Sequence, residues 1–392
     1  MSMSTPDTTL PSVPSSPPAP RRRWPVVTVS VLLVIFVLVV VAGRTQTSYY
    51  VLVPGDAITV SGLISVPKPL AHPLDGRVLL TDVGVNQVNY LTVVPYWLDS
   101  DAELVQTAAL TGNLPASEFY AEGDVDMAES QMTAKAVALR QLGYQVPERD
   151  AGVTVYVIDP SSPAWNVLQV GDVITAIDGV PTPNPTALVA AVHSHRPDDE
   201  VTIRIGSIRD PSDGHDVTLK LGSLKENGKA EPFIGIGDPS APIPGMGTQP
   251  TYSYPFPIQL STDNIGGPSA GLAFTLGLIN TLSGGHLTGG HTVAATGTIH
   301  PDGTVGDVGG VKEKTVAVER AGATLFLVPP QEYAVAKAKA DSSLKVVAVS
   351  SLSQAISVLE RLGGSLGSAA AGPPPGPGGH SVPANWQDSP WT

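Results

Sequence analysis

Residues 264–280 read NIGGPSAGLAFTLGLIN, and this stretch decides how the C-terminal part of the chain is interpreted. Two glycines and a proline precede Ser269, and the apolar run at 270–278 is long enough for a buried helix. Pro268 suits the first turn of such a helix, because that turn does not need its N–H. Ser269 would then lie where free N–H groups and the helix dipole stabilise a developing negative charge. This position favours a nucleophilic serine, although a serine that only caps the helix gives the same pattern.

A second stretch, GGVKEKTVAVERAGA at residues 309–323, predicts a helix with two lysines on different faces. Lys314 shares its face with small and apolar residues, namely Val311, Ala317, Val318 and Ala321. Lys312 faces a half-polar surface formed by Thr315, Val316 and Glu319. A buried lysine loses proton affinity, so it can be neutral near pH 7 and remove the proton of a serine hydroxyl. The alternative is a lysine that extends its ammonium group into solvent at the edge of the helix.

The composition excludes several classes of function. The chain has 392 residues, enough for two or three domains, and its 22 basic and 35 acidic residues give a net charge of −13, which argues against a nucleic-acid partner. It has no cysteine, which excludes disulfides and thiolate metal sites. Its eight histidines show no HExxH or paired metal-ligand spacing, and no GxxxxGKS/T motif occurs. We therefore predict no metal, no nucleotide and no other cofactor.

The N-terminal part predicts a membrane anchor. Residues 1–23 are predicted to be a disordered cytoplasmic segment that ends in three arginines, and residues 24–43 carry no charge and are long enough to span a bilayer. The arginines predict a cell-membrane protein with a cytoplasmic N-terminus and the bulk of the chain outside. The alternative, a cleaved signal peptide, usually has an apolar region of about 7–15 residues and a small-x-small cleavage site. Residues 44–125 are predicted to be a β-rich extracytoplasmic region, with strands at 49–53, 78–81 and 89–94, to which we assign no chemistry.

Residues 126–223 predict a helix at 127–142 followed by a small domain. The stretch GVTVYVIDPSSPAWNVLQVGDVITAIDGVPT at 152–182 contains an alternating strand, a Ser-Pro helix start, a second strand and a tight Asp-Gly turn. It resembles the PDZ domains of bacterial proteases, most specifically in GDVITAIDG. A PDZ domain adds an extended peptide to a sheet edge, and the resemblance places the peptide-gripping loop at Ala151, Gly152, Val153 and Thr154. A small α/β domain without a ligand is the alternative.

Strands and helices alternate in the C-terminal part. Residues 224–255 are rich in Gly, Pro and Ser and are predicted to be a linker. After it we expect strands at 257–260, 292–298, 325–328 and 345–349, and helices at 311–321, 331–340 and 352–362. Residues 364–392 are predicted to be a disordered Pro/Gly-rich tail.

Four separated motifs then occur in order: GGPSAGLAF, ATGTI, PDGTVGDVGGVKEKTVAVERAG and LFLVP. Together they resemble the proteolytic domain of Lon-type serine peptidases over about residues 256–362. Those peptidases use a Ser–Lys dyad, so the resemblance assigns Ser269 as the nucleophile and Lys314 as the general base. It also assigns Thr296 to holding the lysine, and Gly266 and Gly267 to the approach to the serine and to oxyanion donation. The ATP-driven members have an acidic residue three positions before the serine, where this chain has Gly266.

The sequence therefore predicts an α+β multidomain protein. Its predicted parts are a disordered segment at 1–23, a transmembrane helix at 24–43, a β-rich region at 44–125, a PDZ-like domain with a leading helix at 126–223, an α/β Lon-type domain at 224–363 and a tail at 364–392. This layout resembles the bacterial membrane-anchored PDZ–Lon peptidases. It implies an ATP-independent serine endopeptidase that cleaves polypeptide substrates recruited by the PDZ-like domain, with a hexameric ring as a possible homo-oligomer.

Two other functions remain open. One is a catalytically silent, membrane-tethered PDZ adaptor. The other is an α/β-hydrolase, because residues 267–271 satisfy G-x-S-x-G. The hydrolase turn needs an apolar strand directly before it, and residues 261–264, which read STDN, do not supply one.

Overall fold

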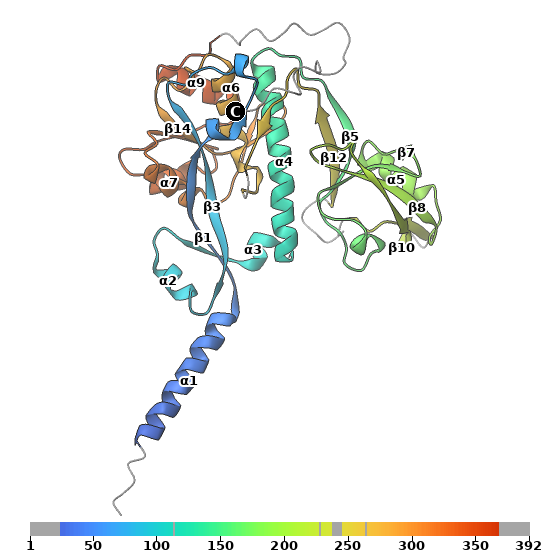
Figure 1. Ribbon diagram of the computed structural model, residues 1–392, viewed down its shortest axis with the longest axis horizontal. Helices are drawn as coiled ribbons and strands as arrows, with labels where there is room; N and C mark the ends of the chain where they lie inside the picture. Colours follow the sequence, from blue (N-terminus) through green and yellow to red (C-terminus); the bar gives the residue numbers. More distant parts are fainter. Residues whose placement is uncertain (1–23, 113, 227–228, 237–244, 263–264, 368–392) are drawn as a thin grey trace, which may run out of the picture.

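The computed structural model describes residues 24–112, 114–226, 229–236, 245–262 and 265–367, which are coloured in Figure 1. The segments 1–23 and 368–392, predicted to be disordered, lie outside the described residues. Helix α1 (Trp24–Arg44) extends away from the rest of the molecule. Its window Val27–Arg44 has a mean hydropathy of 2.7 and none of it is buried, so by length and composition it is a candidate membrane span.

The main sheet combines strands from both ends of the chain in the order β18-β17-β14-β3-β1-β4. The strands are β1 (Gln46–Thr59), β3 (Arg77–Asn89), β4 (Glu103–Gln106), β14 (Thr292–Ala295), β17 (Leu325–Val328) and β18 (Lys345–Ala348). Strand β14 runs parallel to both of its neighbours, and Val293 lies opposite Val78 on one side and Leu325 on the other. Strand β1 pairs antiparallel with β3 and β4.

The sequence predicted that residues 44–125 form a region separate from a proteolytic domain at 224–363, but in the structure strands of both regions form one sheet. Val293, Ala294 and Ala295 of β14 are completely buried, so the backbone groups on both edges of this strand need partners. Strand β17 supplies one edge and β3, more than 200 residues earlier, supplies the other. The N-terminal β-rich region is thus part of the same sheet.

The predicted strand at 89–94 is also wrong. Strand β3 ends at Asn89, whose side-chain oxygen accepts hydrogen bonds from the backbone N–H groups of Leu91 and Thr92. These local bonds turn the chain, and the next element is a short helix, α2 (Val93–Leu98).

Helices cover both faces of the main sheet. Helix α6 (Gly271–Leu282) is wholly buried and shares one core with α4 (Ala116–Gln141), α9 (Leu352–Arg361) and side chains such as Leu80 and Val293. Helices α7 (Val311–Arg320) and α8 (Tyr333–Lys339) pack on the other face, around Leu79, Ala294 and Phe326. Successive residues of a strand point to opposite faces, so each central strand contributes to both cores.

Helix α4 joins two domains, whereas the sequence predicted a helix at 127–142 that belongs to the PDZ-like domain. It begins at Ala116, and one side of it packs in the core of α6 through residues such as Leu139. On its other side, Val125 and Ala128 pack with Val173 of the second large sheet and with Ile208, directly after β8 of that sheet. Figure 1 shows α4 standing between the two sheets.

The second sheet has the order β12-β5-β6-β8-β9, and β7 pairs with β6. Its elements are β5 (Glu148–Val155), β6 (Asp172–Ile177), β7 (Val180–Pro181), α5 (Pro185–His193), β8 (Glu200–Ser207), β9 (His215–Lys220) and β12 (Met246–Tyr252). The predicted Asp-Gly turn is confirmed, because Asp178 and Gly179 have positive φ angles of 46° and 77°.

The predicted linker at 224–255 instead contains most of a hairpin, β10 (Gly222–Glu226) and β11 (Lys229–Phe233), and the edge strand β12. Gln249 is one reason why β12 lies inside the domain and not in a linker. Its buried side-chain oxygen accepts a hydrogen bond from the Thr154 hydroxyl at 2.6 Å, so this polar group is satisfied without water.

The remaining elements are short. They are η1 (Val60–Leu63), β2 (Ile64–Ser65), η2 (Lys68–Leu70), α3 (Thr107–Thr111), η3 (Pro163–Asn166), β13 (Gln259–Leu260), η4 (Pro268–Ala270), β15 (Thr298–Ile299) and β16 (Val305–Gly306). The pairs β2 with β13 and β15 with β16 are antiparallel.

The shared sheet predicts that a substitution near the N-terminus destabilises the C-terminal domain. Leu80→Ala on β3 removes a fully buried side chain and should lower the free energy of unfolding by about 2–5 kcal/mol. Hydrogen exchange at the amides of α6 measures this, with Leu224→Ala, at a half-exposed position of β10, as the control. Unchanged α6 protection in Leu80→Ala would show that the two regions fold independently.

Candidate active site

Ser269 lies in the 3-10 turn η4, directly before the buried helix α6, as the sequence predicts. The chain enters this turn through Gly267, whose φ of 85° favours glycine. The Ser269 carbonyl accepts hydrogen bonds from the Gly297 N–H at 2.9 Å and from the Thr296 hydroxyl at 3.3 Å. A side-chain carbon at Gly271 would lie 2.8 Å from Ile299, so only glycine permits this close packing. The serine is thereby fixed against the end of β14.

Lys314 lies in the first turn of α7 and is 3 % exposed. Its Nζ donates a hydrogen bond to Thr296 Oγ1 at 3.3 Å. Burial lowers the pKa of Lys314 to about 8, although the negative charges of Asp82, Glu332 and Glu313 oppose this effect. A substantial fraction of the lysine is therefore neutral at mildly alkaline pH.

Ser269 and Lys314 line one cavity of about 290 Å³ together with Gly266, Gly267 and Asp82. The other lining residues are Leu52, Thr81, Val83, Val85, Leu110, Ile265, Pro268, Ala270, Gly309 and Gly310. Thr296 connects the two predicted catalytic residues, because its hydroxyl donates to the serine backbone and accepts from the lysine side chain. The cavity is thus lined by a buried lysine and by a serine directly before a helix, the two residue types that a Ser–Lys mechanism uses.

Gly266 and Gly267, whose N–H groups were predicted to donate hydrogen bonds to an oxyanion, both line the cavity, but the N–H of Gly267 already has an acceptor. The N–H of Gly267 donates to the carbonyl of Gly123 in α4 at 2.7 Å. This bond uses the proton that an oxyanion would need, so the expectation that Gly267 donates to an oxyanion is wrong for this conformation.

Asp82 is a site residue that the sequence analysis missed. It lies on β3, in the region to which no chemistry was assigned, and it lines the cavity with Lys314. Burial raises its pKa, and its Oδ1 accepts a hydrogen bond from the Asp56 N–H. The sequence feature that could have indicated Asp82 is its position as the one acidic residue within the mainly apolar stretch RVLLTDVGV at 77–85.

The residues predicted to bind the peptide do not lie at a free edge of the sheet. Ala151, Gly152, Val153 and Thr154 lie in β5, and Val153 pairs with Ile174 of β6 and with Thr248 of β12. Because β5 has partners on both sides, these residues present no free sheet edge to a peptide.

An apolar groove of about 220 Å³ lies elsewhere in this domain, between α5 and residues 232–236. Its walls include Leu188, Val189 and Val192 of α5 and Phe233 and Ile234 opposite them. The run PFIGI at 232–236 was the sequence signal for it, but this run fell within the predicted linker.

No group of three or more His, Asp or Glu side chains suited to a metal ion occurs among the described residues. The prediction that the protein uses no metal remains a prediction.

Two segments match known domain families. Residues 141–221 match the PDZ domain, and residues 263–361 match the Lon protease (S16) C-terminal proteolytic domain. These matches confirm both resemblances found in the sequence, and the chain is a multidomain α+β protein with one segment similar to each of these domains.

Individual proteins show the same similarity. A Lon protease of Chloroflexus aggregans is 34% identical over 94 residues, which are 23% of this chain and 11% of that protein. Lon protease 1 of Sorangium cellulosum is 36% identical over 99 residues, which are 24% of this chain and 12% of that protein. The chain thus spans about a tenth of the length of these relatives. Among solved structures, the PDZ domain of an SdrC-like protein from Listeria monocytogenes is 29% identical, with 22% of this chain and 84% of that chain covered and a TM-score of 0.19.

The buried ammonium group predicts an unusual effect on stability. The lowering of the Lys314 pKa from its ordinary 10.5 to about 8 corresponds to about 3 kcal/mol, at about 1.4 kcal/mol per pH unit. The folded state carries this full penalty below pH 8, and the penalty disappears as the pH rises towards 10.5. Lys314→Met should therefore be more stable than the wild type at pH 7, and the difference should shrink by pH 10.

Urea unfolding at the two pH values measures this. Lys312→Met is the matched control, because the Lys312 side chain is partly exposed and its Nζ donates to the Ala102 carbonyl. A gain in stability for Lys314→Met that is the same at both pH values would contradict a buried ammonium group.

Proposed function

Starting from a PDZ domain and a Lon-type proteolytic domain on one chain, we propose that the protein is a membrane-anchored, ATP-independent serine endopeptidase. Ser269 is the nucleophile and Lys314 is the general base. The observation that carries the proposal is the Thr296 hydroxyl, which contacts both the Ser269 backbone and the Lys314 side chain, two residues that line one cavity. The burial of Lys314 also supports it, because a proton acceptor must be uncharged.

The proposed reaction is acyl transfer to serine followed by hydrolysis. Neutral Lys314 takes the proton of Ser269 as the hydroxyl oxygen attacks the substrate carbonyl, and then passes that proton to the departing amine. The N–H of Ser269, in the turn η4 directly before α6, stabilises the oxyanion. Water then attacks the acyl enzyme, with Lys314 again as the base.

Substrate recruitment is assigned to the groove between α5 and residues 232–236. Its apolar walls suit an extended polypeptide with apolar side chains, which is the ligand type of PDZ domains. The chain carries no GxxxxGKS/T motif, and we propose that cleavage is limited to segments that are already accessible. The anchor is α1, and the domains lie on the outer side of the membrane.

The adaptor alternative has one observation in its favour. The hydrogen bond from the Gly267 N–H to the Gly123 carbonyl removes one expected oxyanion donor. A PDZ adaptor with a silent proteolytic domain would bind polypeptides without cleaving them.

Separate substitutions distinguish the two functions. Ser269→Ala and Lys314→Met should each lower kcat/KM for an unfolded protein substrate by about 10³-fold or more, because each removes one half of a unit that acts together. The full-length protein in detergent is assayed by gel and mass spectrometry, with Lys312→Met as the control that retains activity. Equal fragment yields from all four proteins would exclude the proposed dyad.

The pH dependence tests the identity of the base. The value of kcat/KM should rise with pH through about 8 and then level off, because only the neutral form of Lys314 accepts a proton. The negative charge of Asp82 favours the ammonium form of Lys314. Asp82→Asn should therefore lower the pKa of Lys314 and move the midpoint of the profile to lower pH.

Asp216→Asn is the control for this experiment, since Asp216 is an exposed residue of β9 that pairs with Arg204. Its midpoint should equal that of the wild type. A midpoint that moves to higher pH in Asp82→Asn would contradict the assignment of Lys314 as the base.

A further inference from the structure

Helix α2 is apolar all round, with the sequence VVPYWL, yet only one side of it is covered. On that side, Val93 and Tyr96 pack against the small core formed by Val51, Val88 and Ala102. On the other side, Trp97 is 74% exposed, Leu98 71% and Val94 55%. A surface helix normally presents polar residues to water, so the bare side of α2 indicates a surface that another partner covers.

The turn before α2 extends this apolar surface. Tyr90 is 58% exposed and Leu91 44%. We call Tyr90, Leu91, Val94, Trp97 and Leu98 the α2 patch. It contains two aromatic side chains with a polar atom, three aliphatic side chains and no charge.

Hydrogen bonds fix the α2 patch to the end of α1. The Asn89 side chain donates to the carbonyl of Gly43 at 3.0 Å, and the N–H of Tyr90 donates to the carbonyl of Thr45 at 3.4 Å. Leu91 packs so close to Gly43 that a side-chain carbon there would lie 3.1 Å from Leu91 Cδ1. Figure 1 shows α2 beside the junction between α1 and the β1–β3 ribbon.

This attachment sets the position of the patch relative to a bilayer. The window Val27–Arg44 has 18 residues. A helix of that length spans about 27 Å, which is close to the thickness of about 30 Å of a hydrocarbon core. Gly43 then lies at the membrane boundary, and residues that contact it lie in the interfacial layer. Trp and Tyr are favoured in this layer because each has an apolar ring and a polar atom.

We propose that the α2 patch inserts into the interfacial layer of the bilayer that α1 crosses, on the side of the proteolytic domain. The proposal rests on the membrane anchoring that is part of the proposed function. Lipid is the occupant that the structure favours over a second copy of the chain, because the patch is continuous with the candidate membrane span and combines aromatic and aliphatic side chains.

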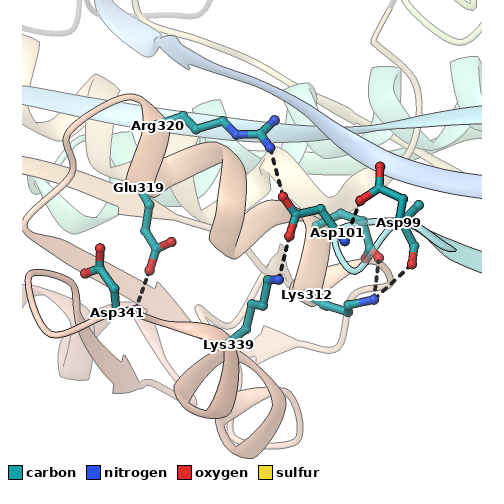
Figure 2. Close-up of polar contacts among 9 residues, drawn as sticks. Asp99, Asp101, Lys312, Glu319, Arg320, Lys339 and Asp341 are labelled. Carbon is teal, nitrogen blue, oxygen red and sulfur yellow. Dashed lines mark hydrogen bonds and ion pairs between the residues drawn. The ribbon is translucent and has the colours of Figure 1, made fainter. Parts of the chain in front are cut away.

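The segment after α2 connects this contact to the proposed active site. Figure 2 shows Asp101 between Arg320 of α7 and Lys339 of α8. The Asp101 carboxylate oxygens lie 3.0 Å from a guanidinium nitrogen of Arg320 and 2.6 Å from Nζ of Lys339. Lys312 of α7 also donates to the carbonyl of Ala102 at 3.0 Å. Helix α7 carries Lys314, so lipid contact at α2 would hold the proteolytic domain at a fixed height and orientation above the membrane.

The absence of cysteine from the chain allows a direct test. Single cysteines replace Leu98 and Val94, and each variant is labelled with an environment-sensitive fluorophore and reconstituted at full length into phosphatidylcholine vesicles. Lipids that carry a nitroxide near the head-group end of the acyl chain report contact with the interfacial layer, lipids that carry it near the methyl end report contact with the hydrocarbon core around position 33, and iodide reports contact with water. Val335→Cys, on an exposed part of α8, and Leu33→Cys, within α1, are the matched controls.

Labels at 94 and 98 should be strongly quenched by the lipid with the nitroxide near the head-group end and protected from iodide, while the label at 335 shows the reverse. If the labels at 94 and 98 behave like the label at 335 while the label at 33 is quenched by lipid, the anchor stands and the α2 patch proposal fails. If the label at 33 is also free of lipid quenching, the anchor itself is wrong. Protection from iodide without lipid quenching would mean that protein covers the patch, which also overturns the proposal.

Discussion

The proteolytic domain depends on one unfavourable interaction, the burial of the Lys314 ammonium group. Among the residues that the structure describes, the Thr296 hydroxyl and three nearby carboxylates, those of Asp82, Glu313 and Glu332, compensate for the water that this group has lost. Burial of a charged group destabilises a fold, so a lysine in this position is expected where its lowered pKa serves a reaction. Helix α7 and the end of β14 hold the lysine and Thr296 in contact.

The surroundings of this lysine come from both ends of the chain. Strand β3 carries Asp82 and pairs with β14, and the segment between α2 and β4 is bonded to α7 and α8. The same N-terminal region continues directly from α1 into β1. The candidate membrane anchor and the cavity are therefore joined by a continuous sheet, in which few residues separate the end of the span from the first strand of the domain.

Helix α4 provides a second connection, between the PDZ domain and the loop that holds Ser269. Its Gly123 carbonyl accepts the Gly267 N–H, and its Ser130 hydroxyl donates to the Pro268 carbonyl at 3.0 Å. On the PDZ side, Glu129 accepts a hydrogen bond from the Tyr156 hydroxyl at 2.7 Å. The loop before the serine thus contacts the same helix as the PDZ domain, and a shift of α4 would change which N–H groups face the cavity.

The sequence by itself determined the features that local patterns encode. These are the serine at a helix start, the lysine on the apolar face of its helix, the tight turn at Asp178 and the apolar span near the N-terminus, because each depends on residues within one or two helical turns or along one strand. Only the tertiary structure decided that β3 completes the sheet, that Asp82 reaches the cavity, that α4 packs on the proteolytic core and that the groove lies at 232–236. These features arise from pairing between segments more than 200 residues apart, and the alternation of apolar residues in a strand does not specify which strand will pair with it.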